Sequence, residues 1–148
     1  MSRKLLLDKI DVPGIRSYEV YRREGGYRSV EKALKMIPAE IVDEVKKSGL
    51  RGRGGAGFPT GMKWSFLAKP EGVPRYLICN ADESEPGTFK DRYLMEFLPH
   101  LLIEGMVVAS FALGSNTSYI YIRGEYAWIT DILENAIAEA KENGFFFG

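Results

Sequence analysis

The sequence predicts an α/β fold in which parallel strands and helices form separate layers. Short segments rich in β-branched and aromatic residues lie at 75–79 and 119–122, and each is followed by helical spacing of apolar residues. Strands that alternate with helices in this way pair in parallel through right-handed crossovers. We expect an N-terminal arm over 1–28 and the α/β domain, which opens with a pair of helices, over 29–148.

The first half of the chain is helical after an irregular start. Pro13-Gly14 and Gly25-Gly26 are turn signals, and Tyr18–Tyr21 between them favours a short strand or an extended segment. The apolar spacing over 30–37 predicts a helix. A second helix is predicted from Pro38, whose missing N–H costs nothing at the first helical position, to about Gly49.

Three further helices are predicted in the second half. Thr88 and Asp91 have the spacing of a capping box, which indicates a helix start near Phe89. Pro99 breaks that helix, and a very apolar one then continues to about residue 113. The last helix covers about 126–143 and has a continuous apolar stripe.

The predicted sheet is thin, because only two strands are indicated. The chain also ends in Phe145-Phe146-Phe147, with only Gly148 beyond. Large apolar side chains seldom stay uncovered at the surface of a soluble domain. We therefore favour an incomplete domain, finished by further chain or by a partner, over the alternative that all three rings tuck into the core.

Composition excludes several functional classes. The 148 residues include 20 Lys and Arg and 20 Asp and Glu, and this balance argues against a nucleic-acid binder that works by bulk basicity. A single cysteine excludes a disulfide framework and, within this chain, a zinc ribbon or an iron–sulfur cluster. The most apolar stretch, 101–113, has about thirteen residues, whereas a membrane span needs roughly 20. We expect no membrane insertion and a cytoplasmic location.

A glycine-rich segment follows the helix pair. Gly52-Arg53-Gly54-Gly55-Ala56-Gly57 matches G-x-G-x-x-G, but a helix precedes it, so the context of the standard dinucleotide fingerprint is missing. Lys63 precedes Trp64 rather than Ser or Thr, so a Walker loop is excluded too. Because glycines lack a Cβ, their backbone N–H groups can approach a phosphate or a flat ring closely. Arg51, Arg53 and Lys63 lie in or next to the loop and could pair with phosphate oxygens. We favour a nucleotide-like ligand over a mobile solvated turn.

An acidic segment, 80–87, directly follows the first strand. Ligands of parallel α/β sheets lie beyond the carboxyl ends of the strands. Carboxylates and an amide suit ribose or ribityl hydroxyls and ring N–H groups, so we expect this segment and the cationic loop to enclose one cavity. Two alternatives stay open: Asp82, Glu83 and Glu85 as ligands of Mg²⁺ or Ca²⁺, and a solvated turn that precedes a helix.

Two other reactive side chains have plainer interpretations. His100 follows Pro99 and is expected to be a helix-start or interface histidine, because no Ser or Cys has a visible pairing with it. Cys79 lies in a strand and is expected to behave as a small buried hydrophobe. The sequence therefore assigns no catalytic residue and no metal ligand.

Two long motifs carry a resemblance to a known family. Arg51–Trp64 resembles the signature of the flavin- and NADH-binding subunit of respiratory complex I, the 51 kDa-type or F-type subunit of NADH:quinone oxidoreductase. Cys79–Arg92 resembles its second signature, and Pro99–Gly105 and Tyr121–Glu125 are similar to later family blocks. Diaphorase subunits of NAD-reducing hydrogenases and formate dehydrogenases are similar too. A truncated, non-catalytic nucleotide-binding module is a further alternative.

The resemblance implies a Rossmann-like FMN-binding domain in which NADH passes a hydride to FMN and electrons continue to iron–sulfur clusters. It implies that a first set of residues contacts FMN, namely Gly52, Gly54, Lys63, Asn80, Asp82 and Glu83. A second set is implied to contact NADH, namely Gly54, Gly55, Phe58, Phe66 and Glu85. Arg53, Ala56 and Gly57 complete the expected cofactor-binding loop.

Members of that family are much longer than this chain. Further along they carry a second glycine-rich flavin segment, a ubiquitin-like domain and cysteines for a [4Fe–4S] cluster, whose ligands are absent here. We therefore expect these 148 residues to correspond to the N-terminal third, to bind FMN weakly or not at all and to be inactive alone. The implied partners are the 24 kDa-type [2Fe–2S] subunit and other peripheral-arm subunits, in a complex at the cell membrane.

Overall fold

The parallel pairing of two strands organises the fold. The computed structural model describes residues 5–67 and 72–145. Strand β1 (Tyr76–Ala81) pairs in parallel with β2 (Thr117–Ile122). Their register sets Tyr76 opposite Thr117 and Ala81 opposite Ile122. The predicted α/β class with a parallel sheet is confirmed, and both strands run somewhat further than their β-branched cores at 75–79 and 119–122 indicate.

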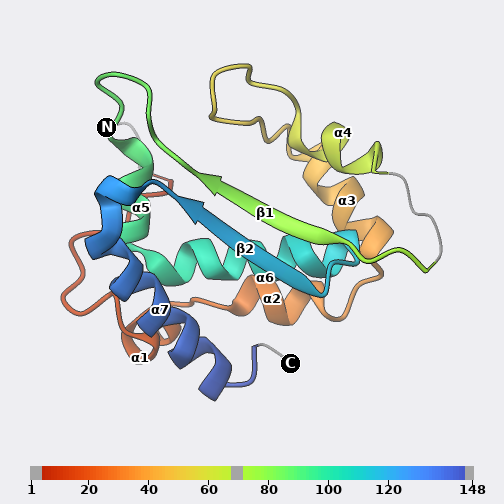
Figure 1. Ribbon diagram of the computed structural model, residues 1–148. Coiled ribbons are helices and arrows are strands. Elements are labelled where there is room, and N and C mark those ends of the chain that lie inside the picture. The colour runs from red at the N-terminus through yellow and green to blue at the C-terminus, as the bar shows by residue number, and fades with distance from the viewer. Residues whose placement is uncertain (1–4, 68–71, 146–148) are drawn as a thin grey trace.

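The crossover between the strands is helical and covers one face of the sheet. It consists of α5 (Lys90–Phe97) and α6 (Pro99–Leu113), and α6 contacts both strands (Figure 1). After β2, a short 3₁₀ turn (Gly124–Tyr126) leads into α7 (Ala127–Glu142), which packs against α5 and α6. The break at Pro99 and the last helix are therefore as predicted.

The opposite face of the sheet is exposed in the described part of the chain. Burial alternates along both strands, as the twofold repeat of a strand requires. Tyr76, Ile78, Tyr119 and Tyr121 point away from the helices and are each more than half exposed. Parallel sheets are ordinarily covered on both faces. It is therefore unusual that this face exposes four large apolar or aromatic side chains.

The predicted helix pair is present as α2 (Arg28–Ala33) and α3 (Pro38–Lys47). Helix α2 ends before Ile37 because Ile37 adopts an extended backbone and forms the N-cap of α3. The stop at Gly49 is confirmed, since its φ of +67° suits glycine. Helix α4 (Thr60–Ser65) was not predicted, and it follows the glycine-rich segment at 52–57.

The strand expected at Tyr18–Tyr21 is wrong. These residues begin α1 (Tyr18–Arg23), and the Ser17 hydroxyl caps it by accepting a hydrogen bond from the Val20 N–H at 3.4 Å. Tyr21 and Tyr27 are buried in the same core as Ile103 of α6. The described part of the 1–28 arm is therefore a packed part of the fold.

A hydrogen-bond network ties this N-terminal region to α6 and α7. The His100 ring is fully buried, with Nδ1 2.8 Å from the Tyr27 hydroxyl and Nε2 3.0 Å from Glu139 Oε2. The same Glu139 oxygen accepts from the Tyr18 N–H at 2.7 Å. Burial lowers the pKa of His100, so the neutral ring donates through Nε2 and accepts from Tyr27 through Nδ1. The expected helix-start histidine is confirmed, as the second residue of α6.

A second buried carboxylate completes this connection. Glu104 of α6 accepts from the Tyr21 hydroxyl at 2.5 Å and from the Ser29 N–H at 3.1 Å. Burial and this carboxylate raise the pKa of Tyr21 above its ordinary range, so the phenol stays protonated. Phe145 packs on Tyr27 with ring centroids 4.2 Å apart, so this ring does tuck into the core, while Phe146 and Phe147 lie outside the described residues.

None of the described helices alone is long and apolar enough to cross a membrane. Helices α5 and α6 pass the length and composition test only as a pair, and the chain bends by 97° between them.

We predict that Gly61→Ala destabilises the protein by about 1–3 kcal/mol, because α4 approaches α3 too closely for a larger side chain. A Cβ at Gly61 would lie 2.7 Å from the Lys46 Cα. Urea unfolding measures the change. Gly105→Ala is the matched control, since no atom lies within 4 Å of its Cβ position and alanine favours the helix. Equal stabilities of the two variants would contradict the close packing of α3 and α4.

We predict that the free energy of unfolding falls as the pH drops below about 6.5, the ordinary pKa of histidine. Unfolded His100 takes up a proton in that range, whereas the folded ring, with its lowered pKa, takes it up only at lower pH. Urea unfolding from about pH 7 to about pH 5 tests this. His100→Gln, which cannot titrate, should lose less stability over the same interval, and an equal loss would show that His100 is not the group responsible.

Candidate functional site

The glycine-rich segment forms a loop that is closed at its base. The Gly52 N–H donates to the Phe58 carbonyl at 2.9 Å, and the Thr60 N–H donates to the Leu50 carbonyl at 2.8 Å. At the tip, Gly55 has a φ of +112°, which side-chain-bearing residues rarely adopt. Among residues 5–67 and 72–145, no atom lies within 4 Å of a Cβ built at Gly54 or Gly55, so these residues leave the space over the loop open to a ligand.

Two of the three predicted cations brace this loop. Arg51 Nε donates to the Gly57 carbonyl at 2.5 Å, and Arg53 Nη1 donates to the Arg51 carbonyl at 2.7 Å. Lys63 instead projects from the last turn of α4 as an exposed side chain. An exposed ammonium next to a glycine-rich loop suits a phosphate, so Lys63 is the best placed of the three cations.

The two phenylalanines predicted to contact NADH lie together. Phe58 from the loop and Phe66 from the end of α4 have ring centroids 6.3 Å apart and an interplanar angle of 55°. They are 47% and 67% exposed, which is high for phenylalanine. Large apolar rings held at the surface next to open backbone are suited to packing on a flat heterocycle.

The acidic segment forms a compact polar turn at the end of β1. Asn80 Oδ1 accepts from the Asp82 N–H at 3.2 Å, and Asp82 Oδ1 accepts from the Ser84 hydroxyl at 2.7 Å. Asn80, Asp82 and Glu85 are exposed, so their oxygens can reach a ligand. In the described residues no group of three or more His, Cys, Asp or Glu side chains is arranged to hold a metal ion.

Glu83 differs from its neighbours because it is 3% exposed and already engaged. Its Oε1 accepts from the Asp91 N–H at 2.7 Å, and its Oε2 accepts from the Arg92 N–H at 3.2 Å. The carboxylate thus binds the first turn of α5, where free N–H groups and the helix dipole favour an anion. Its predicted contact with flavin stays a prediction.

The predicted helix start near Phe89 is confirmed, since α5 begins at Lys90, but the predicted capping box of Thr88 and Asp91 is wrong. The N-cap residue is Phe89, which has no side-chain cap, and the Asp91 carboxylate binds Lys90 instead. Because Glu83 supplies two acceptors to the first turn, a local cap from Thr88 is not needed.

In Figure 1 the glycine-rich loop and the acidic turn, which continues from the end of β1, are both drawn at the top of the view. Two cavities of the structure lie elsewhere, and no residue of either segment lines them. A single cavity between the loop and the turn stays a prediction.

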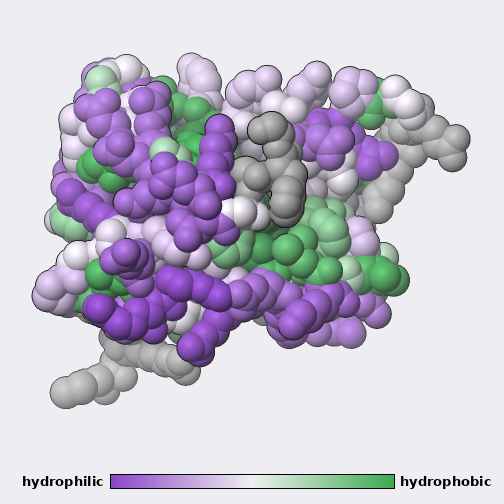
Figure 2. Space-filling view, turned by 90° about the horizontal axis from the view of Figure 1, so that it is seen from below, coloured by the Kyte–Doolittle hydropathy of each residue, from purple (hydrophilic) through white to green (hydrophobic). Residues whose placement is uncertain are grey.

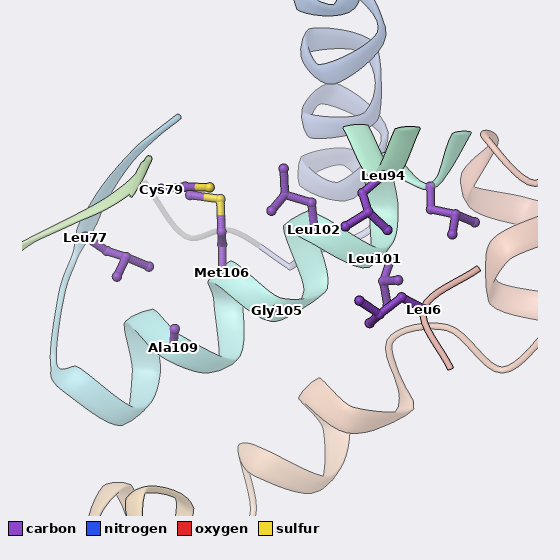
Figure 3. Close-up of a pocket in the computed structure, with 10 residues that line it drawn as sticks. Leu6, Leu77, Cys79, Leu94, Leu101, Leu102, Gly105, Met106 and Ala109 are labelled. Carbon is purple, nitrogen blue, oxygen red and sulfur yellow. The ribbon is translucent and has the colours of Figure 1, made fainter. Parts of the chain in front are cut away.

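Both cavities lie under the sheet; apolar side chains line the smaller one, and the larger one also has polar and charged side chains in its lining, such as Ser118 and Glu134. The smaller one, about 320 Å³, lies between β1 and α6, where Figure 3 shows Cys79 and Met106 with their side chains toward each other. Burial raises the pKa of the Cys79 thiol, which packs as a half-buried apolar group. The larger, about 810 Å³, lies between α6, β2 and α7. The face seen in Figure 2 carries a patch of hydrophobic residues next to hydrophilic ones.

Sequence reasoning missed the residues that hold Glu83 from the second strand. Arg123, directly after β2, donates to the Glu83 carbonyl at 2.6 Å, and the Tyr126 hydroxyl donates to Glu83 Oε2 at 3.3 Å. Both belong to or follow the Tyr121–Glu125 block, to which no role was assigned. The signal that could have found them is parallel pairing, because it brings the ends of the two strands together.

The chain is similar to known F subunits of NADH-quinone oxidoreductases. It is 58% identical over 146 residues to the F 2 subunit of the NADH-quinone oxidoreductase of Rhizobium meliloti, covering 98% of this chain and 35% of the relative. It is 59% identical over 141 residues to the F subunit of the Aquifex aeolicus enzyme, covering 95% of this chain and 33% of the relative. The chain thus spans about a third of the length of these curated relatives.

A solved structure and a family model agree with these relatives. The crystal structure of an NAD⁺-reducing [NiFe]-hydrogenase in the air-oxidized state contains a chain that matches with a TM-score of 0.74 and 39% identity. The match covers 95% of this chain and 23% of that one, and it supports the α/β fold. The model of the Nuo51 FMN-binding domain matches residues 45–146, which include both predicted ligand-binding segments. The resemblance seen in the sequence is confirmed, and the chain belongs to the family of the Nuo51 FMN-binding domain.

Proposed function

We propose that this chain contributes one part of the FMN and NADH site of an NADH-quinone oxidoreductase, within its F-type flavoprotein component. The observation that carries the proposal is the open glycine-rich loop, whose Gly54 and Gly55 leave free space next to the helix that bears Lys63. The donor set fits FMN: backbone N–H groups and an ammonium suit its phosphate, and the exposed oxygens of Asn80 and Asp82 suit ribityl hydroxyls and ring N–H groups.

Each group of residues has a separate task in this proposal. FMN, when bound, supplies the chemistry that accepts a hydride from NADH and passes single electrons to iron–sulfur clusters. Lys63 and the 52–57 backbone hold the phosphate, Phe58 and Phe66 pack on the adenine of NADH, and the acidic turn orients the flavin. No residue of this chain is assigned a proton transfer.

Assembly follows from the same proposal. We infer that the chain works with the 24 kDa-type [2Fe–2S] subunit and other peripheral-arm subunits, at the cytoplasmic side of the cell membrane. The diaphorase subunit of a hydrogenase is the second candidate. It is less favoured because the chain is more similar to the NADH-quinone oxidoreductase relatives than to the hydrogenase chain.

We predict that the 148-residue chain binds FMN only weakly. The proposed site consists of the glycine-rich loop and the acidic turn, and neither of the two cavities under the sheet is lined by these segments. A chimera in which the chain replaces the matching part of the Aquifex aeolicus relative should retain FMN and reduce ferricyanide with NADH. Flavin fluorescence and NADH:ferricyanide assays measure the two properties. Stoichiometric FMN on the purified chain alone would contradict weak binding, and a flavin-free, folded chimera would contradict the function.

We predict that Lys63→Ala weakens FMN binding by about tenfold or more, since it removes a charged hydrogen bond to the phosphate. Fluorescence titration of the chimera gives the dissociation constants. Lys47→Ala is the matched control, because Lys47 is also an exposed lysine in the last turn of a helix but lies on α3. If both variants keep the parent affinity, Lys63 does not belong to the site.

A further inference from the structure

The register of the sheet places the acidic turn beside the start of the β2–α7 connection. Ala81 pairs with Ile122, so Asp82 and Arg123 are the first residues beyond two neighbouring strand ends. Arg123 Nη1 donates to the Glu83 carbonyl at 2.6 Å, which connects the two ends directly. This contact joins residues 40 positions apart in the sequence.

The guanidinium of Arg123 bridges two groups at once. Its Nε and Nη2 donate to the Glu125 carboxylate at 3.1 and 2.8 Å, in the paired geometry that arginine forms with carboxylates. Its third nitrogen, Nη1, donates to the Glu83 carbonyl. The guanidinium carbon lies over the Tyr126 ring, 5.4 Å from the ring centroid. All three nitrogens therefore have protein partners, and the side chain is only 26% exposed.

Glu83 is consequently fixed at both its side chain and its backbone. The carboxylate is held by the first turn of α5 and by the Tyr126 hydroxyl, while the carbonyl is held by Arg123. The exposed Asp82 and Glu85 flank this anchored residue. The direction of their carboxylates thus depends on where the backbone of Glu83 is held.

We propose that Arg123 is a positioning residue for the cofactor site. It acts through the Glu83 carbonyl, holds the 82–87 turn in its ligand-ready position and makes no contact with the cofactor itself. The effect of Arg123 on FMN binding rests on the proposed function. Its effect on the position of the 82–87 turn is the structural half of the inference, and it concerns the flavin-free chain alone. A lysine cannot replace Arg123 fully, because one ammonium cannot supply both the paired bond to Glu125 and the bond to Glu83.

Amide hydrogen exchange of the flavin-free, full 148-residue chain tests the structural half. Arg123→Gln should speed exchange of the Asp82 and Thr88 amides about tenfold, with unchanged exchange in α6, since a charged hydrogen bond is lost. Arg123→Lys should recover only part of the protection. Arg16→Gln is the matched control, because Arg16 also pairs with a carboxylate and lies over an aromatic ring but does not contact the turn.

Two outcomes of the exchange experiment would overturn the proposal: unchanged exchange in Arg123→Gln, or full protection in Arg123→Lys. FMN titration of the Aquifex chimera then tests the functional half, where Arg123→Gln should weaken binding severalfold and Arg16→Gln should not. Faster exchange with unaltered FMN affinity would contradict the link between the turn and the cofactor. A parent chimera that binds no FMN would instead contradict the proposed function, and the exchange result would still decide whether Arg123 positions the turn.

Discussion

The parallel pairing of β1 with β2 is the constraint on which the rest of the structure depends. The backbone ladder fixes which residues leave the two strands side by side, and so it brings Glu83 and Arg123 together. Glu83 in turn supplies the acceptors that start α5, the first helix of the crossover between the strands. Strand pairing, helix initiation and the position of the acidic turn are therefore parts of one arrangement, at the edge where parallel α/β sheets bind their ligands.

The N-terminal region is held in place by polar groups inside an apolar core. His100 and Glu104, both on α6, hydrogen-bond Tyr27 and Tyr21 of the N-terminal region, and each partner is buried. Buried polar groups are costly unless every one is satisfied, so this network specifies one packing of the N-terminal region. It lies away from the glycine-rich loop, so the fold separates the residues that fix the scaffold from those left free for a ligand.

Local pattern was enough to predict most elements of the fold, whereas ligand binding by the two segments stays a prediction. Helix α3 could be predicted because Pro38 and Gly49 mark its ends, and the strands because their residues are β-branched or aromatic. Helix α1 was missed because the Ser17 cap is a single weak signal. The roles of Glu83 and Arg123 could not be predicted locally, because their partners lie 8 and 40 residues away and only the register of the sheet brings them close.

The central claim is that the glycine-rich loop and the acidic turn bind one flavin between them. The most direct test is the amide NMR spectrum of the isotopically labelled chain during titration with FMN. The account predicts that signals from 52–57 and from 82–85 shift together with one dissociation constant, however weak, while those of α7 stay unchanged. Shifts confined to one of the two segments, or centred on the cavities under the sheet, would contradict it.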